Sequence, residues 1–333
     1  MSPLQLLWFL LLAVLFIGFF VLEGFDFGVG MATRLLAKNE GERKQLVATI
    51  GPHWDGNEVW LITAGGAMFA SYPLWYASLF SGFYILFFLV LVGLILRGVS
   101  FEFAAHAQSQ RGRDIWRWAL FVGSVIPPFL LGMIFTAIIQ PLTIDGKMDI
   151  YASLGEQVNL LTIVGGVAVT LMCFMHGLNF IRLKTTGALR LRAWAYNRIL
   201  IWVLYAGAVV FALLVYVSTD FFVKRPLSSG IIIGLIVLAI VCEHFAILKD
   251  REGLSLITSG SALALVVILI FNGLFPRVLI AKEAVNSLLI TQASASNLTL
   301  TIMTGVTVVL LPIALAYFIW AYVVFHKRVP ELS

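Results

Sequence analysis

Long apolar stretches are the feature of this chain that most limits its fold. Stretches of about 20 apolar residues, the length at which an α-helix crosses a bilayer core, recur along the 333-residue sequence. Charged residues make up only 12% of the chain, about half the fraction found in soluble proteins. The sequence therefore predicts an all-α polytopic membrane protein. Its basic residues are concentrated in and next to loops, so its pI near 9.3 does not indicate nucleic-acid binding.

Nine stretches qualify as membrane spans. The first is too long for a cleaved signal peptide and has no basic segment before it. No loop is long enough to fold by itself, so we expect residues 1–333 to form a single integral membrane domain. We expect its helices at about 4–33, 50–70, 76–100, 115–139, 158–181, 197–218, 230–248, 254–275 and 301–325.

The basic residues alternate between loops and predict an orientation. Lys and Arg concentrate after the first, third, fifth and seventh spans and in the C-terminal tail. Cytoplasmic loops of membrane proteins carry this excess. We therefore expect the N-terminus outside and the C-terminus in the cytoplasm. Only five of the 22 Lys and Arg residues fall on the other side: Lys147, Lys224, Arg225, Arg277 and Lys282.

Acidic residues gather in the cytoplasmic halves of the first two spans. LEGFDFGVGM (22–31) places Glu23 and Asp26 three residues apart, hence on one helix face. GPHWDGNEVW (51–60) opens the second span with His53, Trp54, Asp55 and Glu58. At the same depth the third span ends with Arg97 and Glu102, and the seventh with Glu243 and His244.

A carboxylate in hydrocarbon is costly unless it is neutral, paired or hydrated. One interpretation is structural: Arg97 pairs with an acid of the first or second span and fixes the helices. The other is a hydrated proton path from the cytoplasm, in which Glu23, Asp26, Asp55 and Glu58 are relay groups. Four acids on two neighbouring antiparallel helices favour the path, because proton relays are built from such chains.

The residues alone do not indicate a redox cofactor in this chain. None of its predicted helices carries the two spaced histidines of a bis-histidine haem site, and it has no cysteine cluster or nucleotide-binding glycine pattern. Gly28 and Gly30 lie within a membrane span, where small residues allow helices to approach closely.

Several motifs together resemble subunit II of cytochrome bd quinol oxidase. They are EGFDFGVG, GPHWDGNEVWLITAGGAMFASYP, FSGFY, LRGVSFEF and GSVIPPFLLG in the first 140 residues, and SASNLTLTIMTGVTVVLLPIALAYFIWAY near the end. The resemblance implies nine helices, arranged as two four-helix bundles and one peripheral helix. It also implies a proton route through Asp26, Asp55, His53 and Trp54, with Arg97 and Glu102 at the charged end of the third helix.

The same resemblance implies a partner and cofactors. In this family a haem-bearing subunit I, with haem b and haem d, forms a heterodimer with subunit II. The complex oxidises ubiquinol or menaquinol, reduces dioxygen to water and generates a membrane potential without pumping. It lies in a bacterial or archaeal cell membrane among lipids, and the resemblance allows small single-helix accessory subunits and a bound structural quinone.

Two other function classes remain open. A proton-coupled secondary transporter would also place acids within its spans, although transporters usually show repeated halves and helices broken at the midplane. A purely structural scaffold subunit would have the same fold as a proton-conducting one. Only the activity of the assembled complex separates those two functions.

Overall fold

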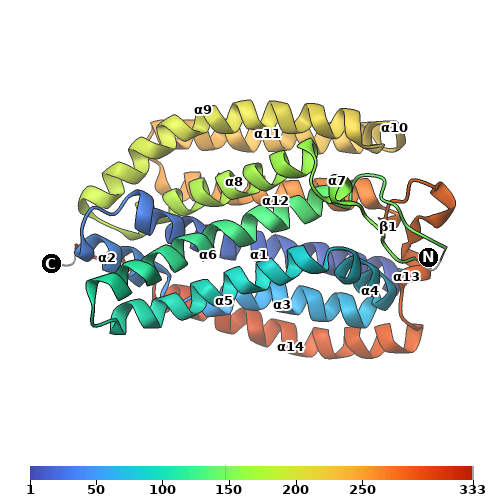
Figure 1. The fold of residues 1–333 in the computed structure, drawn as a ribbon, viewed down its shortest axis with the longest axis horizontal. Coiled ribbons are helices and arrows are strands. Elements are labelled where there is room, and N and C mark those ends of the chain that lie inside the picture. The colour runs from blue at the N-terminus through green and yellow to red at the C-terminus, as the bar shows by residue number, and fades with distance from the viewer. Residues whose placement is uncertain (147, 332–333) are drawn as a thin grey trace.

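The computed structural model describes residues 1–146 and 148–331 and is almost entirely helical (Figure 1). Lys147, which enters the charge argument, lies outside the described residues. The long helices are α1 (Pro3–Leu35), α3 (Trp54–Ser71), α5 (Tyr84–His106), α6 (Gln110–Ala137), α8 (Leu160–Lys184), α9 (Gly187–Ser218), α11 (Pro226–Leu248), α12 (Glu252–Leu274) and α14 (Asn297–Val324). Shorter elements are α2 (Glu40–Ile50), α4 (Pro73–Gly82), α7 (Leu154–Gln157), α10 (Phe221–Lys224), β1 (Arg277–Leu279), η1 (Ala284–Asn286), β2 (Leu288–Leu289) and α13 (Ile290–Ala293).

The long helices form two groups of four with α14 at the edge. In the first group α3 and α6 pack on α1, and α5 packs on α6. In the second group α8, α9, α11 and α12 pack on one another. Helix α1 also packs on α8 and α12 and so joins the groups, whereas α14 contacts α1 and α3 at one side (Figure 1). This arrangement confirms the predicted fold class.

Eight helical segments of the described chain are long and apolar enough to cross a membrane. Helix α3 is not among them, because Asp55, Asn57 and Glu58 make its first turns polar. The count of nine spans, the orientation and the single membrane domain therefore remain predictions. We call the end at which α1 ends and α9 begins the basic end; the C-terminus lies there and the N-terminus at the opposite end (Figure 1).

Three predictions about the extent of the helices were wrong. The expected helix at 76–100 is instead the end of α4, a break at Phe83, and α5, which continues to His106. Helix α9 begins at Gly187, ten residues before the expected start at 197. The expected loop after α1 contains α2, whose N-terminus is capped by Asn39: its Oδ1 accepts a hydrogen bond from the Glu42 backbone N–H at 2.9 Å. Such a cap stabilises a helix, and hydropathy does not reveal this one because it is polar.

Close contact between α1 and α8 depends on glycine. A Cβ atom on Gly28 would overlap the Cys173 carbonyl and lie 2.6 Å from the Cα atom of Gly177. Gly30 likewise faces the Ser124 side chain of α6 without room for a Cβ atom. These contacts confirm the packing role predicted for both glycines and hold α1 at the centre of the molecule.

Candidate functional site

Arg97 of α5 joins the acids of α1 and α3. Its guanidinium forms an ion pair with Glu23, and its Nη2 donates to Glu58 Oε1 at 2.9 Å. The side chains of Arg97 and Glu23 have no exposed surface, whereas that of Glu58 is 20% exposed. Phe27 places its ring 4.8 Å from the guanidinium carbon. The ion pair expected on the structural interpretation is thus present, with acids from both helices.

Asp26 lies one turn from Glu23 and is held by a different set of groups. Its Oδ2 accepts a hydrogen bond from Asn57 Nδ2 at 2.7 Å, and Asn57 Oδ1 accepts one from the Tyr322 hydroxyl at 2.9 Å. Asn57 Nδ2 also lies 3.4 Å from the Leu22 carbonyl oxygen. The carboxyl of Asp26 is fully buried, and its Oδ1 has no hydrogen-bond partner in the described chain.

His53 and Trp54 lie where α3 begins, next to this cluster. The His53 ring stacks on the Tyr322 ring with centroids 4.2 Å apart, and both rings lie at the basic end. Trp54 packs against Phe101 of α5, with ring centroids 4.9 Å apart. Asn57 and Tyr322 were not predicted as site residues. Asn57 lies among the polar residues of the first turns of α3, which was a usable signal, whereas nothing in the sequence near Tyr322 indicated a contact with α3.

The remaining predicted residues lie at the surface. Asp55 is exposed in the first turn of α3, and its carboxylate accepts the Gly56 backbone N–H at 2.7 Å. Glu102 is also exposed and is not brought to the cluster. Five residues beyond Arg97 on a helix of 3.6 residues per turn, it points about 140° away around the axis. The acids therefore range from exposed Asp55 through partly buried Glu58 to buried Glu23 and Asp26.

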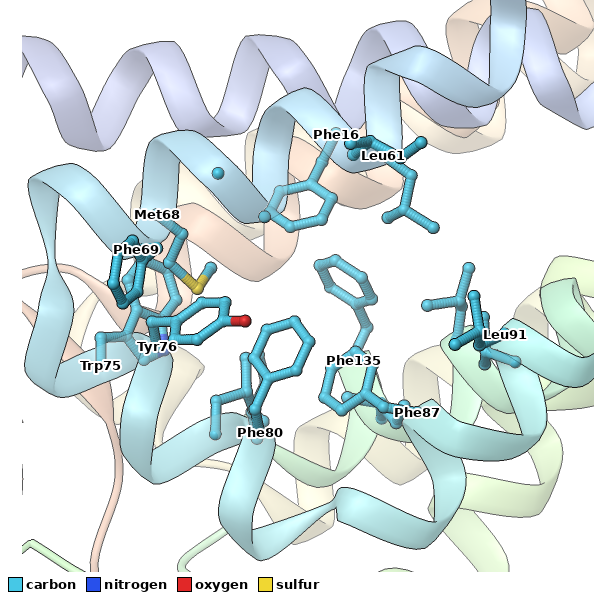
Figure 2. Close-up of a pocket in the computed structure, with 18 of the residues that line it drawn as sticks. Phe16, Leu61, Met68, Phe69, Trp75, Tyr76, Phe80, Phe87, Leu91 and Phe135 are labelled. Carbon is cyan, nitrogen blue, oxygen red and sulfur yellow. The ribbon is translucent and has the colours of Figure 1, made fainter. Parts of the chain in front are cut away.

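An apolar cavity of about 730 Å³ lies farther from the basic end, between α3, α4, α5 and α6 (Figure 2). The rings of Phe16, Tyr76, Phe80 and Phe135 surround it in Figure 2. Trp75, another lining residue, is 1% exposed, and its indole N–H has no acceptor among the residues described. Buried indole groups usually find a partner, so Trp75 has an unused donor in the wall of the cavity.

No three His, Cys, Asp or Glu side chains gather as a metal site within residues 1–146 and 148–331. His176 and His244 are engaged with protein groups: His176 contacts Ser259 and the Val21 carbonyl, and His244 contacts Tyr205.

Comparison with known proteins gives a consistent result over the full length. The family model described as cytochrome bd terminal oxidase subunit II matches residues 4–325. The chain is 45% identical to cytochrome bd ubiquinol oxidase subunit 2 of Bacillus subtilis, covering 99% of this chain and 98% of that one. It is 34% identical to cytochrome bd-I ubiquinol oxidase subunit 2 of Escherichia coli K12, covering 96% and 93%. In fold it is similar to a chain of the bd oxidase structure from Geobacillus thermodenitrificans, with a TM-score of 0.78, 14% identity and coverage of 97% and 98%.

Proposed function

Because the chain belongs to the family of cytochrome bd terminal oxidase subunit II, we propose that it carries protons from the basic end toward the haems of a partner subunit I. The chain is a multi-pass membrane protein of an oxidoreductase complex. In our proposal haem b and haem d are held by subunit I. The complex oxidises ubiquinol or menaquinol and reduces dioxygen to water, taking the protons for water from the cytoplasm.

The observation that carries this proposal is the order of burial among the acids. Asp55 is exposed, Glu58 is 20% exposed, and Glu23 and Asp26 are buried. An exposed acid exchanges protons with water, and a buried one can hold a proton apart from it. In this scheme Asp55 and Glu58 take up protons and Asp26 holds them, while Arg97 balances the charge of Glu23.

The surroundings of Asp26 support a relay role over a purely structural one. A structural lock satisfies all of its buried polar atoms, whereas Asp26 Oδ1 has no partner among the described residues. This free oxygen can accept a proton or a water molecule. Asn57 and Tyr322 fix the other oxygen, so they act as positioning residues. His53 and Trp54 cover the cluster on the side of the basic end.

The test is Asp26→Asn, expressed with subunit I and purified as a complex. We expect normal haem content with quinol-driven oxygen uptake lowered tenfold or more, which corresponds to about 1.4 kcal/mol of barrier. Glu102→Gln is the matched control: it removes an exposed acid outside the cluster, so both measurements should be unchanged. Loss of haem or of the partner would instead support the scaffold function, and full activity in Asp26→Asn would exclude the relay role.

We also propose that the cavity lined by Phe16 and Phe135 holds the apolar tail of a structural quinone, with Trp75 donating to a carbonyl group of its ring. The aromatic lining and the unpartnered indole N–H fit such a molecule. Trp75→Phe should lower the quinone extracted per purified complex several-fold. The exposed Trp118 supplies the control variant, Trp118→Phe. Unchanged quinone content in Trp75→Phe would contradict this proposal and indicate that the cavity holds lipid chains instead.

A further inference from the structure

A second buried polar network lies between α8, α9, α11 and α12. At its centre, Asn179 Nδ2 donates to Glu243 Oε1 at 2.7 Å and to Ser259 Oγ at 3.2 Å. Asn197 Nδ2 donates to Asn179 Oδ1 at 2.8 Å. Asn179 and Asn197 are fully buried, and Glu243 is 1% exposed. Side chains from four helices therefore meet around a single amide group.

His176 fixes the direction of the hydrogen bonds at one side of the network. Its Nε2 lies 2.9 Å from the Val21 carbonyl oxygen, and a carbonyl can only accept, so Nε2 carries a hydrogen. In the neutral imidazole Nδ1 is then an acceptor, and it lies 2.7 Å from Ser259 Oγ. Ser259 has one hydroxyl hydrogen, shared between this nitrogen and the Leu256 carbonyl at 3.0 Å. It has none left for Glu243.

No cation is paired with Glu243 in the described chain. Arg182 of α8 is the nearest positive group, but its Nη2 pairs with Asp250 at 2.8 Å and its Nη1 lies 3.4 Å from Ser255 Oγ. On α11 itself the neighbouring His244 bonds Tyr205 of α9 at 3.2 Å, and Glu252 of α12 is paired with Arg190 and Arg328. An unpaired buried carboxylate costs several kcal/mol.

The network also lacks a donor. Asn197 Oδ1 is a fully buried acceptor without a partner among the described residues. Buried acceptors are nearly always satisfied, and both Asn197 and Glu243 are bonded to the Asn179 amide. A proton on Glu243 would turn an unpaired charge into a neutral acid and add a donor to a network that lacks one.

We propose that Glu243 is a second proton-binding site, whose carboxyl group carries a proton at neutral pH and donates it within this network. Glu243 Oε1 accepts from Asn179, so the proton resides on Oε2. The site lies in the other helix group from Asp26, and the inference does not depend on the proton path proposed there.

Polar contacts connect this site to the basic end. Asn179 Nδ2 lies 3.3 Å from the Ser255 carbonyl, and Ser255 Oγ contacts Arg182, which pairs with Asp250. The Asp250 side chain is 54% exposed. The exposed end of this network therefore lies at the basic end, and we expect Glu243 to exchange its proton with the solution there.

The test is infrared difference spectroscopy on the purified complex at neutral pH. Glu243→Gln should remove one C=O stretching band of a protonated carboxylic acid while haem content is unchanged. In D₂O the same band of the wild-type complex should move to lower frequency, because the proton exchanges. Glu252→Gln is the matched control: Glu252 is a buried acid of the neighbouring helix α12 with two arginine partners, so its loss should leave the protonated-acid bands unchanged.

Asn197→Ala gives a second, independent measurement. It keeps the acid but removes the unpartnered acceptor of the network and the hydrogen bond to Asn179, so the band assigned to Glu243 should shift in frequency without disappearing. This variant carries the test if Glu243→Gln does not assemble. An assembled Glu243→Gln complex that loses no protonated-acid band, or an unchanged band in Asn197→Ala, would overturn the proposal. A band insensitive to D₂O would overturn the exchange route. None of these results depends on the oxygen uptake measured for Asp26→Asn.

Discussion

Replacing Arg97 by methionine should be among the most damaging single changes in the first helix group. The Glu23 side chain has no exposed surface, and neither of its oxygens has another partner in the described chain. Without Arg97 its charge would therefore be buried and uncompensated. Removing one member of a buried ion pair costs about 3–5 kcal/mol. Glu58 adds little to this loss, since its side chain is 20% exposed and partly hydrated pairs are worth about 0–1 kcal/mol. We therefore expect Arg97→Met to lower the free energy of unfolding by about 3–5 kcal/mol.

A double-variant cycle tests the physical reason. Glu23→Gln alone leaves Arg97 paired with Glu58 and should cost about 1–3 kcal/mol. The double variant Arg97→Met/Glu23→Gln contains no unpaired charge from this pair, so it should be clearly more stable than Arg97→Met alone.

The assay is an SDS titration of the purified complex in detergent, followed by helical circular dichroism. Haem absorbance recorded on the same samples shows whether the complex is assembled at the start. If the double variant loses the sum of the two single losses to within about 0.5 kcal/mol, Arg97 and Glu23 are not energetically coupled. That result would refute the reasoning that an uncompensated charge on Glu23 makes the loss of Arg97 so costly.

Three further results are expected. Gly28→Val should abolish assembly, because the valine side chain would meet the α8 backbone and overpacking of this kind costs about 1–3 kcal/mol or more. The control is Gly65→Ala, which should give a normal yield of complex because no atom lies within 4 Å of its Cβ position. The hydrogen bond from Arg182 holds the pKa of Asp250 below its usual range. The stabilisation of the folded protein by Asp250 is therefore present above the unfolded pKa and is lost as pH falls through the folded pKa. Melting temperatures measured down to acid pH should show this loss in the wild type and not in Asp250→Asn. Tyr322→Phe should lower oxygen uptake several-fold at constant haem content, since a hydrogen bond is worth about 1 kcal/mol; unchanged uptake would exclude a positioning role.

The acids could be placed from the sequence because helix geometry is local. Glu23 and Asp26 share a face at a spacing of three residues, and the depth of Arg97 in a neighbouring span predicts an ion pair with an acid of the first or second span, which is found with Glu23 and Glu58. The same argument from depth failed for Glu102, because depth does not specify direction around a helix. Its position five residues from Arg97 turns it away from the cluster.

The parts that escaped prediction depend on tertiary packing. Tyr322 reaches Asn57 across 265 residues of sequence, and no local pattern encodes that contact. The break between α4 and α5 lies within a continuously apolar stretch, so hydropathy could not separate the two helices. Glu243 was seen as an ionisable residue near a span end, but its partner Asn179 lies on another helix.

Helix α1 accepts hydrogen bonds from both helix groups at consecutive residues. His176 of α8 bonds the Val21 carbonyl, and Asn57 of α3 bonds the Leu22 carbonyl. Rotation or sliding of α1 would break one or both of these bonds, and Gly28 leaves no clearance against α8. Helix α1 is therefore a fixed axis about which neither group can turn freely. In the proposed proton path, changes at Glu23 and Asp26 would therefore occur through side-chain rotation and protonation, at constant backbone position, rather than through the helix movements by which alternating-access proteins work.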